Sequence, residues 1–251
     1  MDTSKIKKKY LKKQGKQIPT NIKNPRLRTI ARIHTDFTTK FGIPRQSGLV
    51  DDLKAVIIFE PEYRNPDALR GLEEFTHIWL IWQFSENIRD TWSPMVKPPR
   101  LGGNKRMGVF ATRSPFRPNP IGLSCVKLEG IERFPDFGPL LIVSGADLMD
   151  NTPIYDIKPY LPYTDSHPEA IGGFAEAYKD EKLKVEFPEK WLNMIPEEDK
   201  KALYGVLEQD PRPGYQNDPN RIYGFEYAGF DIRFRVKNQV LTVCEVVILD
   251  E

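Results

Sequence analysis

Short apolar runs, separated by proline and glycine and not by regular helices, are the feature that most constrains the fold of this chain. The runs are rich in Val, Ile, Leu and aromatic residues, and they lie at 29–35, 55–59, 78–84, 107–111, 123–131 and 140–144. Runs of this length and composition predict β-strands. Successive strands joined by turns predict a mainly β fold, a barrel or a sandwich, and exclude a doubly wound sheet. In this half only 67–75 has helical spacing.

The last third of the chain has a different pattern. The composition changes to Pro, Gly, Asp and Ser at 162–173, which is typical of a linker and predicts a boundary near residue 165. Beyond it, 197–209 predicts a helix that begins after Pro196, and four runs predict strands, at 183–187, 221–227, 231–236 and 240–249. We therefore expect a basic arm at 1–27, a β-barrel at 28–165 and a small α+β domain at 166–251.

The charge of the chain is concentrated at its N-terminus. The net charge is +2, but residues 1–28 hold ten Lys or Arg against one acid, Asp2, which leaves −7 for the remainder. Such an arm either binds phosphates of a nucleic acid, releasing counterions, or is a solvated tail. The sequence favours neither alternative.

Several classes of protein are disfavoured. No apolar run approaches the roughly 20 residues of a membrane helix, and the N-terminus has no secretory signal, so we expect a cytoplasmic protein without a membrane partner. Cys125 and Cys244 lie in separate apolar runs, which favours two buried thiols over a disulfide. The three histidines are scattered, and no metal site is expected. Motifs for nucleotide phosphates, zinc proteases and serine hydrolases are absent or incomplete.

The segment 108–122 carries most of the functional information, and it reads GVFATRSPFRPNPIG. Three prolines within six residues restrict the backbone and predict a stiff, extended loop. This loop presents Arg113, Arg117 and Asn119. Two guanidiniums on a stiff loop suit an anionic ligand, and the alternative is a structural crossover with solvated arginines.

This segment resembles the fifteen-residue signature of the TrmO or TsaA-like (YaeB) family of tRNA (adenine-N6)-methyltransferases. Four further blocks resemble the family in the same order: FGIPRQ at 41–46, PPRLGGN at 98–104, DLMDNTPIYDIKPY at 147–160 and QDPRPGY at 209–215. The last block has Gly214 where the family commonly has Ala. The resemblance extends from residue 28 to about residue 250.

The resemblance implies a single-sheet β-barrel that binds S-adenosylmethionine and works as a homodimer. It also implies methylation of N6 of the threonylcarbamoyl-modified adenosine 37, next to the anticodon of tRNA(Thr). The implied cofactor contacts are Pro44, Arg45, Gln46, Ser85, Glu86, Arg113, Leu123, Asp147, Leu148, Met149 and Asp150. The family commonly has His at the position of Ser85, so a hydroxyl replaces an imidazole there.

The chemistry of these residues agrees with such a cofactor. Arg45 or Arg113 suits its carboxylate, and Asp147 or Asp150 suits its amine and ribose hydroxyls. Without the resemblance, 147–150 is typical of a turn at the end of a strand.

The substrate side has its own candidates. Asn119, followed by Pro120, offers two carbonyl acceptors for the proton that leaves N6, so Asn119 is the candidate catalytic residue; alternatively it bonds its own loop. Arg117, Arg212 and Tyr215 are candidates for contacts with the anticodon stem-loop of tRNA. Two other functions remain open, a non-catalytic RNA-binding β-barrel module and a barrel enzyme for a small anionic metabolite.

Overall fold

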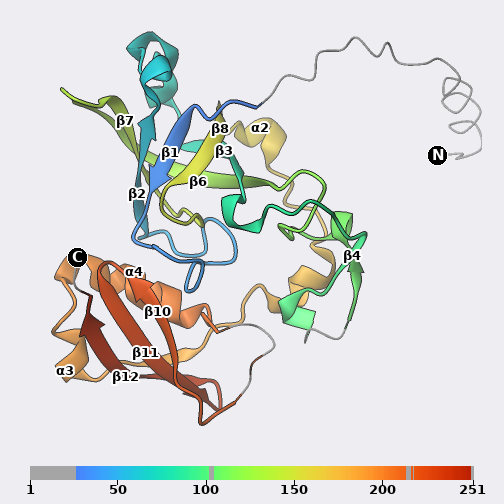
Figure 1. Ribbon diagram of the computed structural model, residues 1–251, viewed down its shortest axis with the longest axis vertical. Helices are drawn as coiled ribbons and strands as arrows, with labels where there is room; N and C mark the ends of the chain where they lie inside the picture. Colours follow the sequence, from blue (N-terminus) through green and yellow to red (C-terminus); the bar gives the residue numbers. More distant parts are fainter. Residues whose placement is uncertain (1–26, 102–104, 213–215, 217, 250–251) are drawn as a thin grey trace, which may run out of the picture.

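A closed six-stranded barrel forms the first part of the molecule (Figure 1). This computed structural model describes residues 27–101, 105–212, 216 and 218–249. The barrel order is β1-β2-β7-β6-β3-β8, and every neighbouring pair is antiparallel. Its strands are β1 (Ala31–His34), β2 (Lys54–Phe59), β3 (His77–Gln83), β6 (Ile121–Phe134), β7 (Gly138–Ser144) and β8 (Thr152–Pro159). The prediction of a mainly β, single-sheet barrel is confirmed.

The barrel closes around alternating apolar side chains. In β3, every second residue is buried, and Ile78 and Leu80 have no exposed surface. Ile33, Ile57 and Ile154 meet them in one core cluster. Because successive side chains of a strand point to opposite faces, the alternate positions of β3 remain available to the outer surface.

Three sequence-based expectations for this half differ from the structure. The helix expected at 67–75 is wrong: η3 (Pro66–Leu69) and η4 (Leu72–Glu74) are short 3₁₀ turns, separated by Gly71 at φ 85°. A left-handed residue cannot continue a right-handed helix. The strand expected at 107–111 is shorter, because β5 (Met107–Gly108) pairs with β4 (Met95–Val96) and then gives way to η7 (Val109–Ala111). Strand β8 was not expected.

The second part is a four-stranded sheet of order β10-β11-β12-β9. Its strands are β9 (Lys184–Glu186), β10 (Tyr223–Tyr227), β11 (Phe230–Lys237) and β12 (Val240–Ile248). The expected helix is α4 (Glu197–Glu208), preceded by α3 (Glu189–Leu192). Leu203 and Leu207 of α4 are fully buried in the same cluster as Ile232 and Leu241 of the sheet. The predicted α+β character of this part is confirmed.

Short helical turns occupy the remaining connections. They are η2 (Pro61–Tyr63), η5 (Ser85–Asn87), η6 (Pro99–Leu101), α2 (Pro162–Asp165) and η8 (Gly173–Tyr178). The last two lie in the stretch between the barrel strands and the second sheet. The division near residue 165 stays a prediction.

The loop between β1 and β2 joins the two parts (Figure 1). Phe37, Val50 and Leu53 of this loop are buried in the cluster formed by α4 and the second sheet. The ring of Phe37 lies 5.4 Å from that of Tyr227, centroid to centroid. The loop is therefore held by the C-terminal sheet, although both strands that flank it belong to the barrel.

The cysteines, the possible metal ligands and the helices add three observations. Cys125 and Cys244 are free thiols, as expected, but both are half-buried and not fully enclosed. Within the described residues, no three His, Cys, Asp or Glu side chains are grouped to hold a metal ion. No described helix is both long enough and apolar enough to cross a bilayer.

Candidate functional site

The first half of β6 has an edge that no barrel strand covers. Strand β7 pairs with β6 only from Lys127 onward, whereas β3 pairs with it from Ile121. Leu128 N donates to Thr76 O at 2.8 Å, and Phe84 N donates to Pro120 O at 2.9 Å. Because hydrogen-bonded pairs alternate along an antiparallel ladder, the even-numbered residues of this stretch direct their backbone groups toward β3. Leu123 therefore directs its N–H and C=O toward the uncovered edge.

The loop that contains Pro44, Arg45 and Gln46 lies along this edge. Cys125 N, also directed away from β3, donates to Ser47 Oγ at 3.2 Å. Gln46 Oε1 accepts a hydrogen bond from Arg113 NH1 of the proline-rich loop. The structure thus brings Gln46, Arg113 and Leu123 together from three separate segments, and Pro44 of the same loop is buried.

Arg45 points away from this group and toward the C-terminal part. Its NH2 group donates to the carbonyl oxygens of Asp210 and Arg212, both at 3.4 Å. Of the two arginines considered for the cofactor carboxylate, Arg113 is the one that stands next to the uncovered edge. Arg45 connects that edge to the 210–212 segment.

Asp147 lies half-buried beside the same edge. Its Oδ1 atom accepts a hydrogen bond from Ser124 Oγ at 2.5 Å, and Ser124 Oγ accepts one from Trp82 Nε1 at 2.9 Å. Burial raises the pKa of the Asp147 carboxyl above its usual range, while Ser124, the backbone amides of Asp147 and Ser47, and Arg113 oppose that rise. A carboxylate in this setting gains stability from any cation that approaches it.

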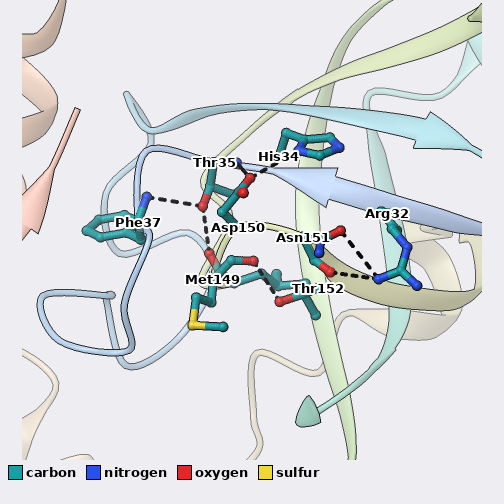
Figure 2. A network of polar contacts seen from close by, with 9 residues as sticks. Arg32, His34, Thr35, Phe37, Met149, Asp150, Asn151 and Thr152 are labelled. Atoms are coloured by element: carbon teal, nitrogen blue, oxygen red, sulfur yellow. Dashed lines mark hydrogen bonds and ion pairs between the residues drawn. The ribbon is translucent and has the colours of Figure 1, made fainter. Parts of the chain in front are cut away.

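Asp150 takes part in a second network at the end of β1 (Figure 2). Its Oδ1 atom is 3.1 Å from Thr35 N, which donates to it, and 3.1 Å from His34 Nδ1. Asp150 N donates to Phe37 O at 2.8 Å. The Asp150 carboxylate therefore holds the backbone where the chain leaves β1. This structural role agrees with the interpretation of 147–150 as a turn at the end of a strand.

The two residues between the aspartates, Leu148 and Met149, hold the turn through their backbone carbonyl groups. Leu148 is 1% exposed, and its carbonyl oxygen accepts a hydrogen bond from Thr35 Oγ1 at 3.1 Å. The carbonyl oxygen of Met149 accepts one from Thr152 Oγ1 at 2.6 Å. Asn151 follows with φ 60°, and Arg32 NH1 donates to its side-chain and backbone oxygens. Figure 2 shows these contacts closing the turn between Asp150 and β8.

Ser85 and Glu86 lie in η5, directly after β3. Phe84 N bonds to Pro120 O, so η5 adjoins the end of the proline-rich loop. Ser85 is half-buried and Glu86 is exposed. Neither side chain has a hydrogen bond or an ion pair with another described residue. Both are therefore placed at the border of the site without being committed to another contact.

The proline-rich loop uses one of its two arginines to hold itself. Arg117 NH1 donates to Thr112 O at 3.0 Å and to Ser114 O at 3.3 Å. Arg89 lies over the ring of Phe116, 3.8 Å from its centroid. The Asn119 side chain is exposed and forms no hydrogen bond with the residues described here, while its backbone carbonyl accepts one from Ile121 N at 2.8 Å. The alternative in which this side chain bonds its own loop is not the geometry observed.

Arg212 is already paired within its own segment. Its Nε and NH2 groups donate to the two oxygens of Asp210, each at 2.7 Å, and its side chain is 12% exposed. This bidentate pair raises the pKa of the guanidinium. A contact with RNA at this point would use an arginine whose charge Asp210 already balances. Tyr215 lies outside the described residues.

Sequence reasoning missed four side chains that organise the site: His34, Thr35, Ser47 and Ser124. Ser124 alone left a signal, since a hydroxyl in the apolar run 123–131 needs a partner when buried. The other three lie in a polar loop or at a strand end, where Ser, Thr and His are ordinary. Only the folded chain brings them to Asp147, Asp150 and the edge of β6.

Comparison with known proteins identifies the family. The model of the tRNA-methyltransferase O N-terminal domain matches residues 32–166, and the model of the TrmO C-terminal domain matches residues 180–248. The chain belongs to the tRNA-methyltransferase O family. The resemblance inferred from the 108–122 segment is thereby confirmed.

Relatives of this family match along most of the chain. The tRNA (adenine(37)-N6)-methyltransferase of Escherichia coli (strain K12) is 39% identical over 215 residues, which cover 82% of this chain and 91% of the relative. The protein of the same name from Eikenella corrodens is 45% identical over 164 residues, covering 65% and 92%. The crystal structure of TrmO from Pseudomonas aeruginosa superposes with a TM-score of 0.74 at 32% identity, covering 91% and 99%. The similarity to tRNA-methyltransferase O therefore includes the C-terminal sheet.

Proposed function

We propose that this chain is an S-adenosylmethionine-dependent methyltransferase that acts on N6 of adenosine 37 in tRNA. The observation that carries this proposal is the match to the E. coli relative, which bears that activity in its name and matches 82% of this chain. A Pseudomonas aeruginosa relative, 39% identical over 213 residues, is named a putative S-adenosylmethionine-dependent methyltransferase.

The uncovered edge of β6 has donors and acceptors that fit such a cofactor. S-adenosylmethionine presents a sulfonium cation, an amine, a carboxylate, ribose hydroxyls and an adenine. The Arg113 guanidinium suits the carboxylate, and the Asp147 carboxylate suits a cationic or hydroxyl group. The N–H and C=O of Leu123 point the same way, so they form the donor–acceptor pair that the edge of an adenine needs.

The transfer itself requires alignment more than it requires a reactive side chain. When bound, S-adenosylmethionine supplies the methyl group, and this chain must hold the acceptor nitrogen in line with the bond that breaks. The rigid, proline-rich loop that carries Arg113 meets that need. Asn119, exposed beside Pro120, is our candidate hydrogen-bond acceptor for the N6 proton, which is finally released to water.

The preferred substrate in this proposal is the threonylcarbamoyl-modified adenosine of tRNA(Thr). A carbamoyl group on N6 withdraws the nitrogen lone pair and makes its proton more acidic. A neutral carbonyl acceptor such as that of Asn119 then suits the reaction better than it would suit an unmodified amine. Arg117 and the 209–215 segment remain candidates for contacts with the anticodon loop.

We further propose that the chain works in the cytoplasm as a homodimer. The β4–β5 pair extends from the barrel (Figure 1). Two exposed apolar side chains flank it, Trp92 before β4 and Phe110 after β5, and their rings stack with centroids 6.1 Å apart. Such a patch suits a second copy of the chain. Light scattering at micromolar concentration should give twice the 29.0 kDa of one chain. A monomer mass would contradict this assignment.

A methylation assay with defined tRNA tests the function. Purified protein is incubated with S-adenosylmethionine and tRNA(Thr), isolated with and without the threonylcarbamoyl group, and nucleosides are measured by mass spectrometry. Methylated adenosine 37 is expected, with a faster reaction on the modified tRNA. A transcript with guanosine at position 37 is the control. RNA binding without methyl transfer or cofactor binding would instead support a non-catalytic RNA-binding module.

A further inference from the structure

A buried chain of hydrogen bonds leads from the barrel core to Asp147. Trp82 on β3 is 6% exposed, and its Nε1 atom lies 2.9 Å from Ser124 Oγ on β6. Ser124, 1% exposed, lies 2.5 Å from Asp147 Oδ1. Polar groups this deep in an apolar barrel are costly unless they are paired, and here each has its partner.

The direction of this chain is fixed by chemistry. An indole N–H only donates, so Ser124 Oγ must accept from Trp82. The hydroxyl hydrogen of Ser124 is then directed to the remaining partner, the Asp147 carboxylate. Trp82 thereby selects the rotation of the hydroxyl in which Asp147 is an acceptor.

Gly122 makes room for this arrangement. Trp82 pairs with Gly122 across the β3–β6 ladder, and Ser124 lies diagonally beside it on the same face. A Cβ at position 122 would come within 2.2 Å of Trp82 Cε2. The indole therefore crosses β6 at Gly122, where there is no side chain, and reaches Ser124 on the same face. The ring of Phe84 also packs against the indole, with the two centroids 4.3 Å apart.

We propose that Trp82 and Ser124 are positioning residues for the cofactor site, which hold the Asp147 carboxylate ionised and oriented toward a cationic or hydroxyl group of S-adenosylmethionine. This inference rests on the proposed function, because it assigns Asp147 to the cofactor. It goes beyond it, because neither Trp82 nor Ser124 is among the residues that the family resemblance implies.

The surroundings of Asp147 explain why it needs such support. Burial raises the pKa of this carboxyl and favours its neutral form. Among the described residues, Arg113 is the charged side chain that acts on this pKa, and the carboxylate of Asp150 is turned to Thr35 and His34. Arg113 also contacts Gln46 and lies on a loop, so the Ser124 hydroxyl is the donor to Asp147 that the barrel itself fixes.

The test measures cofactor affinity by calorimetry as a function of pH, from neutral pH down to the lowest pH at which the protein remains folded. In the wild type, affinity should fall toward acid pH as Asp147 takes up a proton. Ser124→Ala removes the donor to the carboxylate, so the midpoint should rise by about one pH unit and affinity should fall roughly tenfold below the wild-type midpoint. Trp82→Phe should shift the midpoint in the same direction but by less. In a protein that already carries Ser124→Ala, it should cause no further shift.

Trp79→Phe is the matched control. Trp79 lies on the same strand, and its Nε1 atom also donates to a carboxylate, Asp165 Oδ2 at 2.9 Å, on the other face. This variant loses an equivalent bond without touching Asp147, so its affinity profile should match the wild type. Thermal unfolding of each variant shows whether an effect on affinity comes from lost structure.

The outcomes separate the inference from the proposed function. If the wild type binds S-adenosylmethionine and both Ser124→Ala and Trp82→Phe behave like Trp79→Phe, then Trp82 and Ser124 have no positioning role. If Asp147→Asn binds as tightly as the wild type at every pH, Asp147 lies outside the site and the inference fails while the function stands. A wild type that binds no S-adenosylmethionine overturns both.

Discussion

Gly42 lies directly against the ring of Phe225: a Cβ at position 42 would come within 2.3 Å of Phe225 Cδ2. Gly42 also has φ 84°, a conformation that side chains rarely adopt. The residue stands two positions before Pro44, at the start of the loop that reaches the edge of β6. The contact thus places the C-terminal sheet against the root of the candidate cofactor loop.

Gly42→Ala should destabilise the protein strongly. The positive φ costs about 1–2 kcal/mol for a residue with a Cβ, and the clash with Phe225 adds about 1–3 kcal/mol. Gly48→Ala is the control, because Gly48 has φ 74° but open space where its Cβ would lie. Denaturant unfolding should show a clearly larger loss for Gly42→Ala, and equal losses would mean that the Phe225 contact is unimportant.

Asp36→Asn should stabilise the protein at neutral pH. Burial, followed by the charges of Asp199 and Asp150, raises the pKa of the Asp36 carboxyl. The folded state therefore prefers the protonated acid. The stability gained from this preference is present below the unfolded pKa of about 3.9 and is lost as the pH rises through the folded pKa. The substitution should gain up to about 1 kcal/mol at pH 7 and little at pH 3.5.

Thermal unfolding at the two pH values checks this expectation. Asp90→Asn, at an exposed position, is the reference for removing a carboxylate charge. A gain that is the same at both pH values would show that ionisation of Asp36 is not its cause.

Asp150→Ala should lower both stability and cofactor affinity. The substitution leaves Thr35 N without its acceptor, and it removes a carboxylate next to the proposed site. We expect a loss of roughly 1.5–3 kcal/mol of binding free energy for S-adenosylmethionine, the range for bonds to charged groups. Asp150→Asn keeps an acceptor for Thr35, so it should restore much of the stability but little of the affinity. Calorimetry on a folded Asp150→Ala protein with unchanged affinity would remove Asp150 from the site.

Asn119→Ala should slow methyl transfer without weakening binding. If the Asn119 carbonyl accepts a hydrogen bond from the N6 proton in the transition state, its removal should reduce the single-turnover rate on the order of 100-fold with cofactor and tRNA both saturating. Rapid-quench measurement of methylated adenosine gives this rate. An unchanged rate would refute the role, and a loss confined to cofactor affinity would assign Asn119 to holding the loop that bears Arg113.

Deletion of residues 1–25 should weaken tRNA binding and reduce its salt dependence. These residues lie outside the described part of the chain, but they hold most of the ten basic residues of 1–28. Each lysine that neutralises a phosphate adds to the slope of log K against log salt concentration. Filter binding at several salt concentrations measures the slope. A truncated protein with the slope of the wild type would identify the arm as a solvated tail.

The barrel was largely predictable from sequence because alternating burial leaves a pattern. Strand β8 escaped prediction because Pro153 and Pro159, at its ends, and the polar residues between them are typical of loops. The helix at 67–75 failed at Gly71, whose left-handed backbone no apolar spacing reveals.

The site was predictable only in part. The loop containing Arg113 was found because its residues are contiguous, but the direction of Arg45 toward Asp210 and Arg212 depends on packing between distant segments. Trp82, Ser124 and Asp147 are likewise separated by 42 and 23 residues in sequence, and no spacing indicates that they meet.

The burial of Phe37, Val50 and Leu53 in the C-terminal core has a consequence for how this protein melts. The loop that carries them is tethered at both ends to barrel strands, so the barrel and the C-terminal sheet share one set of buried contacts. Heat or urea should therefore unfold the chain in a single cooperative transition, with tryptophan fluorescence and circular dichroism changing together. A fragment that stops at residue 165 would present these three side chains to water and aggregate, although every strand of its barrel is complete.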